Sequence, residues 1–214
     1  MLNINQITPE GLESGQFETQ LPQFYALREV IENNPWHISQ SVFDHLVKTF
    51  KSSDYVLSLE YLNNKNSIEV ILDQKVGKLT KRECLKIAML FHDIAKNTCL
   101  LTNSEGKTVA PHHENIGSII VEDFYKDFDL EESDKKLIKK LIFFHGLSHD
   151  TINLSIEKND NQTFLDIFKK ITEEDWVLLL LLIYADMMGS DVEQELPGIF
   201  NSRTETIKSF LETA

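Results

Sequence analysis

The sequence has little cysteine and no apolar run long enough to cross a membrane. Only two cysteines occur, Cys84 and Cys99, and they lack zinc-site spacing. A disulfide framework is therefore not expected, and a reducing cytoplasmic location fits. The longest apolar run, residues 177–185, is far shorter than the roughly 20 residues that a membrane span needs. The N-terminus has neither the basic start nor the apolar core of a secretion signal, so we expect a cytoplasmic chain without membrane contact.

Basic residues are also in short supply. Lysine and arginine together number 21 against 34 aspartates and glutamates, which gives a net charge of −13. Electrostatic binding of duplex DNA normally needs a clustered basic face, so duplex DNA is disfavoured as a partner. A small or single-stranded phosphorylated substrate, held mainly by a metal ion, stays compatible with the charge.

The length of 214 residues suits one domain with a full-sized core. The hydrophobic fraction of 42% and the charged fraction of 26% are ordinary for a globular protein, and no internal repeat occurs. Prolines and glycines among polar residues predict an irregular N-terminal arm over residues 1–22. A single domain is expected over residues 23–214.

The prediction of a functional site starts from one stretch, TKRECLKIAMLFHDIAK at residues 80–96. Thr80 followed by Glu83 is a capping-box start for a helix. The apolar residues that follow predict a buried helix that ends in His92 and Asp93. Because unpaired buried charge is costly, an imidazole and a carboxylate in this place indicate a metal ion that satisfies them.

Almost every periodic segment has helical spacing, and no convincing alternating strand appears. The predicted class is therefore all-α. The segments 97–111 and 149–162 are expected to be loops, with His149 and Asp150 in the second loop and without a role. The expected helices cover residues 23–32, 38–50, 54–62, 80–96, 113–125, 133–145, 164–169, 172–186 and 203–211.

Further histidines and acidic residues fall on different predicted helices, where they can converge on one site. Neutral imidazole nitrogens and carboxylate oxygens suit divalent iron, manganese, zinc, cobalt or nickel. Asp191 is a rival to Asp186, and His112 is a rival to its neighbour, but both are less favoured. The candidate metal ligands are His45, His92, Asp93, His113, His145 and Asp186.

The order His45, His92-Asp93, Asp186 resembles the H…HD…D motif of the HD-domain metal-dependent phosphohydrolases. His113 and His145 match the extended motif that can hold a second metal. The likeness is closest to the HD region of bacterial CCA-adding enzymes, and it covers residues 36 to about 190. Residues 92–118, HDIAKNTCLLTNSEGKTVAPHHENIGS, are similar to the HD-GK…GK…GHE-GA stretch of that group. Nothing resembles its nucleotidyltransferase head, so nucleotide addition is not implied.

The resemblance implies an HD-type helical bundle that hydrolyses a phosphoester of a nucleotide or short RNA. Water activated by one or two divalent ions (Mn, Fe, Ni, Co, Zn or Mg) would attack the phosphorus. Asp93 would reach both ions and orient the attacking water. Lys96 and His37 are the candidates for substrate phosphate contact or leaving-group protonation.

Other readings stay open. HDIAK followed by HENIGS also resembles the HD domain of a bacterial endoribonuclease, which gives a single-stranded RNA nuclease as the alternative. A regulator that binds a nucleotide or metal without turnover would use the same pocket. Lys96 could simply complement the C-terminal end of its helix, and His37 could pack beside Trp36. His113 and His145 could be hydrogen-bonded helix-end residues beside a single metal.

Overall fold

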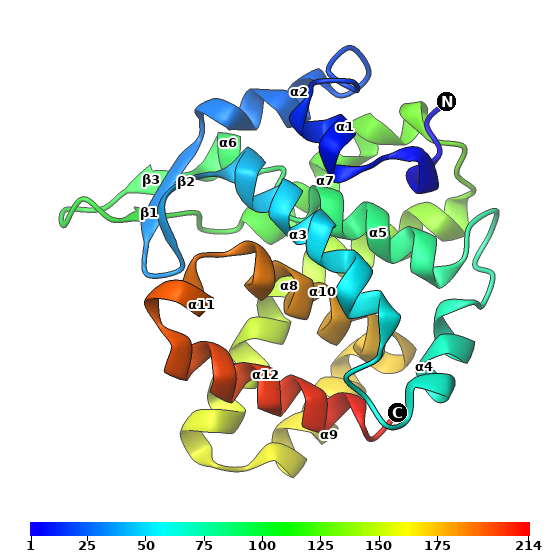
Figure 1. Ribbon diagram of the computed structural model, residues 1–214, viewed down its shortest axis with the longest axis vertical. Coiled ribbons are helices and arrows are strands. Elements are labelled where there is room, and N and C mark those ends of the chain that lie inside the picture. The colour runs from blue at the N-terminus through cyan, green and yellow to red at the C-terminus, as the bar shows by residue number, and fades with distance from the viewer.

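Helices account for most of the chain in the computed structural model, which describes residues 1–214 (Figure 1). The predicted all-α class is confirmed. The centre of the fold is a group of four helices in which α5 and α10 each contact the other three. These helices are α3 (Val42–Ser58), α5 (Lys81–Phe91), α8 (Glu132–Lys158) and α10 (Trp176–Gly189).

Shorter helices surround this group. Among them, α12 runs along α10 and α8 near the C-terminus, and α7 packs on α8. The remaining α-helices are α1 (Pro9–Glu13), α2 (Pro22–Tyr25), α4 (Lys65–Leu72), α6 (Lys96–Cys99), α7 (His113–Ile120), α9 (Asn161–Thr172), α11 (Val192–Glu195) and α12 (Pro197–Leu211). The 3₁₀ helices are η1 (Ile4–Gln6), η2 (Ala26–Glu29), η3 (Val121–Asp127) and η4 (Glu173–Asp175).

Helix α5 begins as the sequence predicts. The backbone N–H of Glu83 donates to Oγ1 of Thr80 at 3.2 Å, and the Glu83 carboxylate accepts from the Thr80 N–H at 2.8 Å. This capping box satisfies two of the otherwise unpaired N–H groups at the helix start. Behind it, the apolar residues from Leu85 to Phe91 are buried in the core. The helix therefore delivers His92 and Asp93 to the interior of the molecule.

Two small hairpins depart from the prediction that strands are absent. β1 (Ile31–Asn34) pairs with β2 (His37–Ser41), and β3 (Leu101–Thr102) pairs with β4 (Thr108–Val109). They replace the end of the predicted 23–32 helix, the start of the predicted 38–50 helix and part of the 97–111 loop. Asn34 explains the first turn, because its Oδ1 accepts from the N–H groups of Trp36 (2.9 Å) and His37 (3.2 Å).

The two hairpins lie side by side at one edge of the molecule (Figure 1). The backbone N–H of Asn33 donates to Oγ1 of Thr108 at 2.7 Å, which links them. Helix α3 then begins at Val42, with Ser41 as its N-cap, rather than near residue 38. It continues to Ser58, so most of the separate helix predicted over 54–62 belongs to α3.

Helix α8 contradicts the prediction that a helix ends near His145 and a loop covers 149–162. It runs without a break through Gly146 to Lys158. Gly146 lies where Glu114 of α7 packs against α8, since an added Cβ would come within 2.2 Å of the Glu114 carboxylate oxygen. The glycine therefore permits a close helix contact instead of ending the helix. The polar residues after it include Thr151 and Ser155, which are buried.

The first 22 residues, expected as an irregular arm, are partly helical. They form η1 and α1 and bury Ile4 and Leu12 in the same core as the rest of the chain. Thr8 caps α1 by accepting from the N–H of Gly11. The arm is thus packed onto the domain expected over 23–214.

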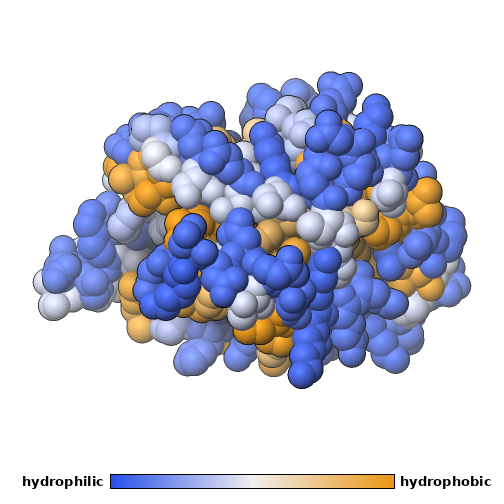
Figure 2. Space-filling model, turned by 90° about the horizontal axis from the view of Figure 1, so that it is seen from below, coloured by the Kyte–Doolittle hydropathy of each residue, from blue (hydrophilic) through white to orange (hydrophobic).

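The surface is mainly hydrophilic on the face seen in Figure 2, where apolar groups lie in separate patches between polar side chains. Scattered exposed apolar residues are normal for a folded chain. None of the helices combines the length and the apolar character that a membrane span requires.

Candidate metal centre

All six predicted metal ligands meet in the interior of the helical bundle. They come from α3, from the turn that follows α5, from the first residue of α7, from the middle of α8 and from α10. Two groups of three form, and the donor atoms within each group lie within 4.8 Å of one another. The first group is His45, His92 and Asp186, and the second is Asp93, His113 and His145.

The first group is centred on an oxygen of Asp186. Its Oδ1 lies 3.0 Å from Nε2 of His45 and 3.5 Å from Nε2 of His92. The two imidazole Nε2 atoms are 3.3 Å apart. Both histidines are completely buried.

The second group is centred on Oδ1 of Asp93. This oxygen lies 3.2 Å from Nε2 of His113 and 3.7 Å from Nε2 of His145. Those two nitrogens are 3.1 Å apart. The predicted place of His145 at a helix end is wrong, since it lies within α8, but its side chain reaches the predicted site.

Asp93 joins the two groups. While Oδ1 faces His113 and His145, Oδ2 lies 3.3 Å from Nε2 of His45 and 3.3 Å from Nε2 of His92. Each carboxylate oxygen therefore faces its own pair of imidazoles. One carboxylate is in position to serve two ions.

Backbone carbonyls set the orientation of three of the imidazoles. Nδ1 of His92 bonds to the carbonyl of Met89 (3.1 Å), and the second group has the same arrangement. A carbonyl only accepts, so each Nδ1 carries a proton, and a ring without a second proton directs the Nε2 lone pair inward. In the second group these bonds are His113 to Ala110 (2.7 Å) and His145 to Ile142 (2.6 Å).

Three acceptors therefore face one another in the second group. Oδ1 of Asp93 is buried and has no hydrogen-bond donor, and the imidazoles of His113 and His145, when neutral, turn lone pairs toward it. Such a cluster needs protons or a cation between the acceptors, because mutually facing lone pairs repel. Imidazole nitrogens and carboxylate oxygens suit a divalent transition ion, so the residues present fit a metal. The donor set does not identify which metal.

Close helix packing places Asp186 beside His45. A Cβ at Gly189, one turn after Asp186, would come within 2.2 Å of Oγ1 of Thr49 and 3.0 Å of the His45 carbonyl oxygen. Only a glycine lets α10 approach α3 this closely. The close approach brings a carboxylate of one helix to an imidazole of the other.

The carboxylates and imidazoles stabilise each other's charge. Burial would raise the pKa of Asp93, but Lys96 and His92 hold it well below its usual range. Burial would likewise raise the pKa of Asp186, which His92 and His149 hold well below its usual range. Burial would lower the pKa of His92, but the charges of Asp93 and Asp186 raise it to about 10. In the absence of a metal, protons therefore occupy part of the cluster at neutral pH.

We expect the stability of the metal-free protein to fall as the pH rises from 7 toward 10. The pKa of His92 is about 10 in the folded chain and 6.5 when unperturbed, so the folded state binds more protons in this interval. The stabilisation is complete below pH 6.5 and is lost as the pH passes the folded value. Bound divalent ions replace these protons, so the metal-loaded protein should lose much less stability over the same pH interval. Thermal unfolding with chelator and with Mn²⁺ measures the difference; a chelated protein that gains stability over this interval would contradict the expectation.

Lys96 and His37 lie behind Asp93 in a buried polar network. Nζ of Lys96 contacts Oδ2 of Asp93 (2.8 Å) and both carboxylate oxygens of Glu32 (3.0 and 2.9 Å). Nδ1 of His37 bonds to Oε1 of Gln40 at 2.5 Å. Glu32 and Gln40 are neighbours of the centre that the sequence did not indicate, because only the β1–β2 pairing brings them there.

These contacts favour a supporting role for both residues. Burial and the charges of His45 and Lys96 lower the pKa of His37 to about 4, so this ring is neutral at pH 7. Burial would lower the pKa of Lys96, but Asp93 and Glu32 raise it, so the ammonium stays charged. The predicted contacts of Lys96 and His37 with a substrate stay predictions.

His149, which was expected in a loop without a role, reaches the centre from α8. Its Nε2 lies 2.7 Å from Oδ2 of Asp186, and Arg203 of α12 contacts its Nδ1. A signal was available, since His145 and His149 are four residues apart and so share one face of a helix. The signal was missed because the helix was predicted to end at residue 145, before His149.

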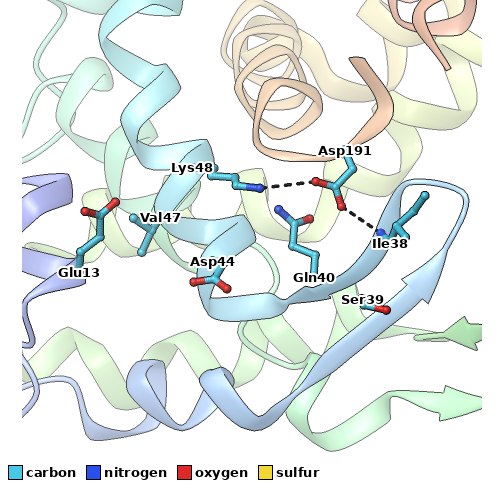
Figure 3. A pocket seen from close by; sticks show the side chains of 8 residues that line it. All are labelled: Glu13, Ile38, Ser39, Gln40, Asp44, Val47, Lys48 and Asp191. Atoms are coloured by element: carbon cyan, nitrogen blue, oxygen red, sulfur yellow. Dashed lines mark hydrogen bonds and ion pairs between the residues drawn. The ribbon is translucent and has the colours of Figure 1, made fainter. Parts of the chain in front are cut away.

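The rival ligands lie elsewhere. Asp191 accepts from the N–H of Ile38 (2.9 Å) and pairs with Lys48 (3.5 Å). It lines a pocket of about 310 Å³ to which none of the six candidate ligands contributes (Figure 3). His112 is exposed, and Asp150 is exposed as well. The residues that line the cavity are Glu13, Ile38, Ser39, Gln40, Asp44, Val47, Lys48 and Asp191.

Neither a scan against protein-family models nor a search of the curated proteins finds a match for this chain. The class that the fold and the site define is accordingly an all-α protein with a buried histidine–aspartate centre suited to metal ions.

Proposed function

We propose that the protein is a metal-dependent phosphohydrolase of the HD type, which uses two divalent ions to hydrolyse a phosphoester of a nucleotide. The observation that carries the proposal is the position of Asp93. Its two oxygens each face a different imidazole pair, at 3.3 Å from both His45 and His92 and at 3.2 Å from His113.

The protein residues have distinct parts in this proposal. His45, His92 and Asp186 would hold one ion, His113 and His145 would hold the other, and Asp93 would bind both. Divalent ions held there lower the pKa of coordinated water toward about 7 and polarise a phosphoryl oxygen. Lys96 fixes the orientation of Asp93 through Oδ2.

The exposure of the centre favours a small substrate. Most of the donor residues are buried, while the side chains of His113 and His149 retain 17% and 25% of their exposure. The centre is therefore least shielded from solvent at these two residues. A terminal phosphate or a compact nucleotide suits this approach better than a long RNA strand, and the net charge of −13 points the same way.

Turnover of chromogenic phosphomonoesters and phosphodiesters, measured across Mn²⁺, Ni²⁺, Co²⁺ and Mg²⁺, tests the proposal. We expect hydrolysis that chelator abolishes and that added metal restores. His112→Asn is the matched control, because this histidine neighbours His113 in sequence but is exposed, and it should keep wild-type activity. A protein that carries two ions per chain and hydrolyses no phosphoester would contradict the proposal.

A labelled oligonucleotide distinguishes the nuclease alternative. Cleavage of the oligonucleotide with mononucleotides left intact would replace the proposal by a single-stranded RNA nuclease. Tight nucleotide binding without any product, lost in Asp93→Ala, would replace it by a regulator that uses the same pocket.

A further inference from the structure

A buried arginine and a histidine lie directly behind the metal-facing side of Asp186. Arg203 is 1% exposed, although arginine is rarely buried without a carboxylate partner. Its guanidinium contacts Nδ1 of His149 and Oδ1 of Asn153, and its Nε lies 3.3 Å from the sulfur of Met187. The nearest negative charge along this chain of contacts is Asp186, on the far side of the His149 ring.

The guanidinium determines which nitrogen of His149 carries the proton. Arginine has donors only, so the nitrogen that faces it, Nδ1, must accept. The neutral ring then carries its proton on Nε2, which donates to Oδ2 of Asp186 at 2.7 Å. His149 thus lies between a buried cation and a buried carboxylate and forms a hydrogen bond with each of them.

This hydrogen bond leaves Asp186 one free oxygen toward the centre. Oδ2 is occupied by His149, while Oδ1 lies 3.0 Å from Nε2 of His45 and 3.5 Å from Nε2 of His92. The ring of Trp36 lies over the guanidinium of Arg203 at 4.8 Å, which limits its movement. The arrangement fixes the carboxylate in a one-oxygen orientation before any ion binds.

We propose that His149, held in one tautomer by Arg203, is a positioning residue that aims Oδ1 of Asp186 at the ion shared with His45 and His92. The inference rests on the proposed metal centre and adds a carboxylate–histidine–arginine relay to it. Partners of this kind typically change metal affinity by about 10–100-fold when they are removed. The effect should fall on the ion of the first ligand group and spare the ion that His113 and His145 would hold.

Metal titration of the chelator-stripped protein against a competing indicator, with Mn²⁺ as the probe, tests the affinity. His149→Leu removes both hydrogen bonds and should lower the affinity for one of the two ions by about 10–100-fold. His149→Gln can donate to Asp186 and accept from Arg203, so it should restore affinity to within a few-fold. His112→Asn is the control for loss of a histidine, and it should bind as the wild type does.

The outcomes separate this inference from the function proposed above. If the wild type binds two ions and His149→Leu binds both equally well, the positioning role is overturned while the metal centre stands. Equal losses in His149→Leu and His149→Gln would also overturn it, because the hydrogen bonds would then not matter. A wild-type chain that binds no Mn²⁺ would overturn the metal centre itself.

The tautomer can be observed without metal or activity. In a ¹⁵N-histidine-labelled protein, long-range ¹H–¹⁵N correlation should show His149 with a protonated Nε2 and an unprotonated Nδ1. Arg203→Met should convert this signal to a mixture of tautomers, if the buried substitution still folds. A protonated Nδ1 in the wild type would overturn the inference independently of the variant.

Discussion

Asp93→Asn should lower phosphoester turnover by on the order of 10³-fold or more and reduce bound metal to less than one ion per chain. The substitution keeps the shape of the side chain but removes the negative charge that faces four imidazoles. Its two oxygens lie 3.2–3.7 Å from the Nε2 atoms of His45, His92, His113 and His145. An amide nitrogen in place of one oxygen would point its hydrogens at a position where a metal ion needs a lone pair. Turnover at saturating Mn²⁺ and elemental analysis of the same samples measure both effects.

Asp191→Asn is the matched control for this change. Asp191 is also an aspartate. It lies shortly after Asp186 in the sequence and pairs with Lys48 outside the centre. It should keep wild-type turnover and metal content. If Asp93→Asn retained two ions and wild-type turnover, the two-ion assignment would be wrong.

Lys96→Met should destabilise the metal-free protein by about 3–5 kcal/mol, the usual cost of leaving a buried charge without its partner. Nζ of Lys96 contacts Asp93 at 2.8 Å and Glu32 at 2.9 Å, and all three side chains are buried. Without the ammonium, the buried Glu32 carboxylate loses its cationic partner, and Asp93 keeps only the imidazoles of the centre. Urea unfolding at pH 7 with chelator present measures the change in the free energy of unfolding.

The double variant Glu32→Gln/Lys96→Met is the informative companion. It removes one carboxylate together with the ammonium, so it should be more stable than Lys96→Met alone. Strictly additive effects of the two substitutions would contradict a coupled ion pair. A loss of turnover in Lys96→Met with unchanged stability would instead favour the direct substrate contact that the sequence suggested.

The features predicted from the sequence depend on local patterns. The capping box of Thr80 and Glu83 and the apolar spacing of α5 are encoded within a few residues, so α5 begins where predicted. The ligand types were also visible, because histidine and aspartate at helix positions have few other uses in a core. Their convergence followed from a family resemblance rather than from the residues alone.

The features that were missed depend on contacts between distant segments. A helix was predicted to end at residue 145, but Gly146 accommodates Glu114 of α7, so α8 continues and brings His149 to Asp186. Glu32 reaches Lys96 only because β1 and β2 pair, and strands this short have no distinct periodicity. Arg203 is buried by packing that no local pattern records.

Electron paramagnetic resonance of the protein titrated with Mn²⁺ tests the central claim most directly. Two ions joined by the carboxylate of Asp93 should give an exchange-coupled signal that appears between one and two equivalents and disappears in Asp93→Asn. A spectrum of isolated Mn²⁺ at every stoichiometry, unchanged by that substitution, would contradict the account.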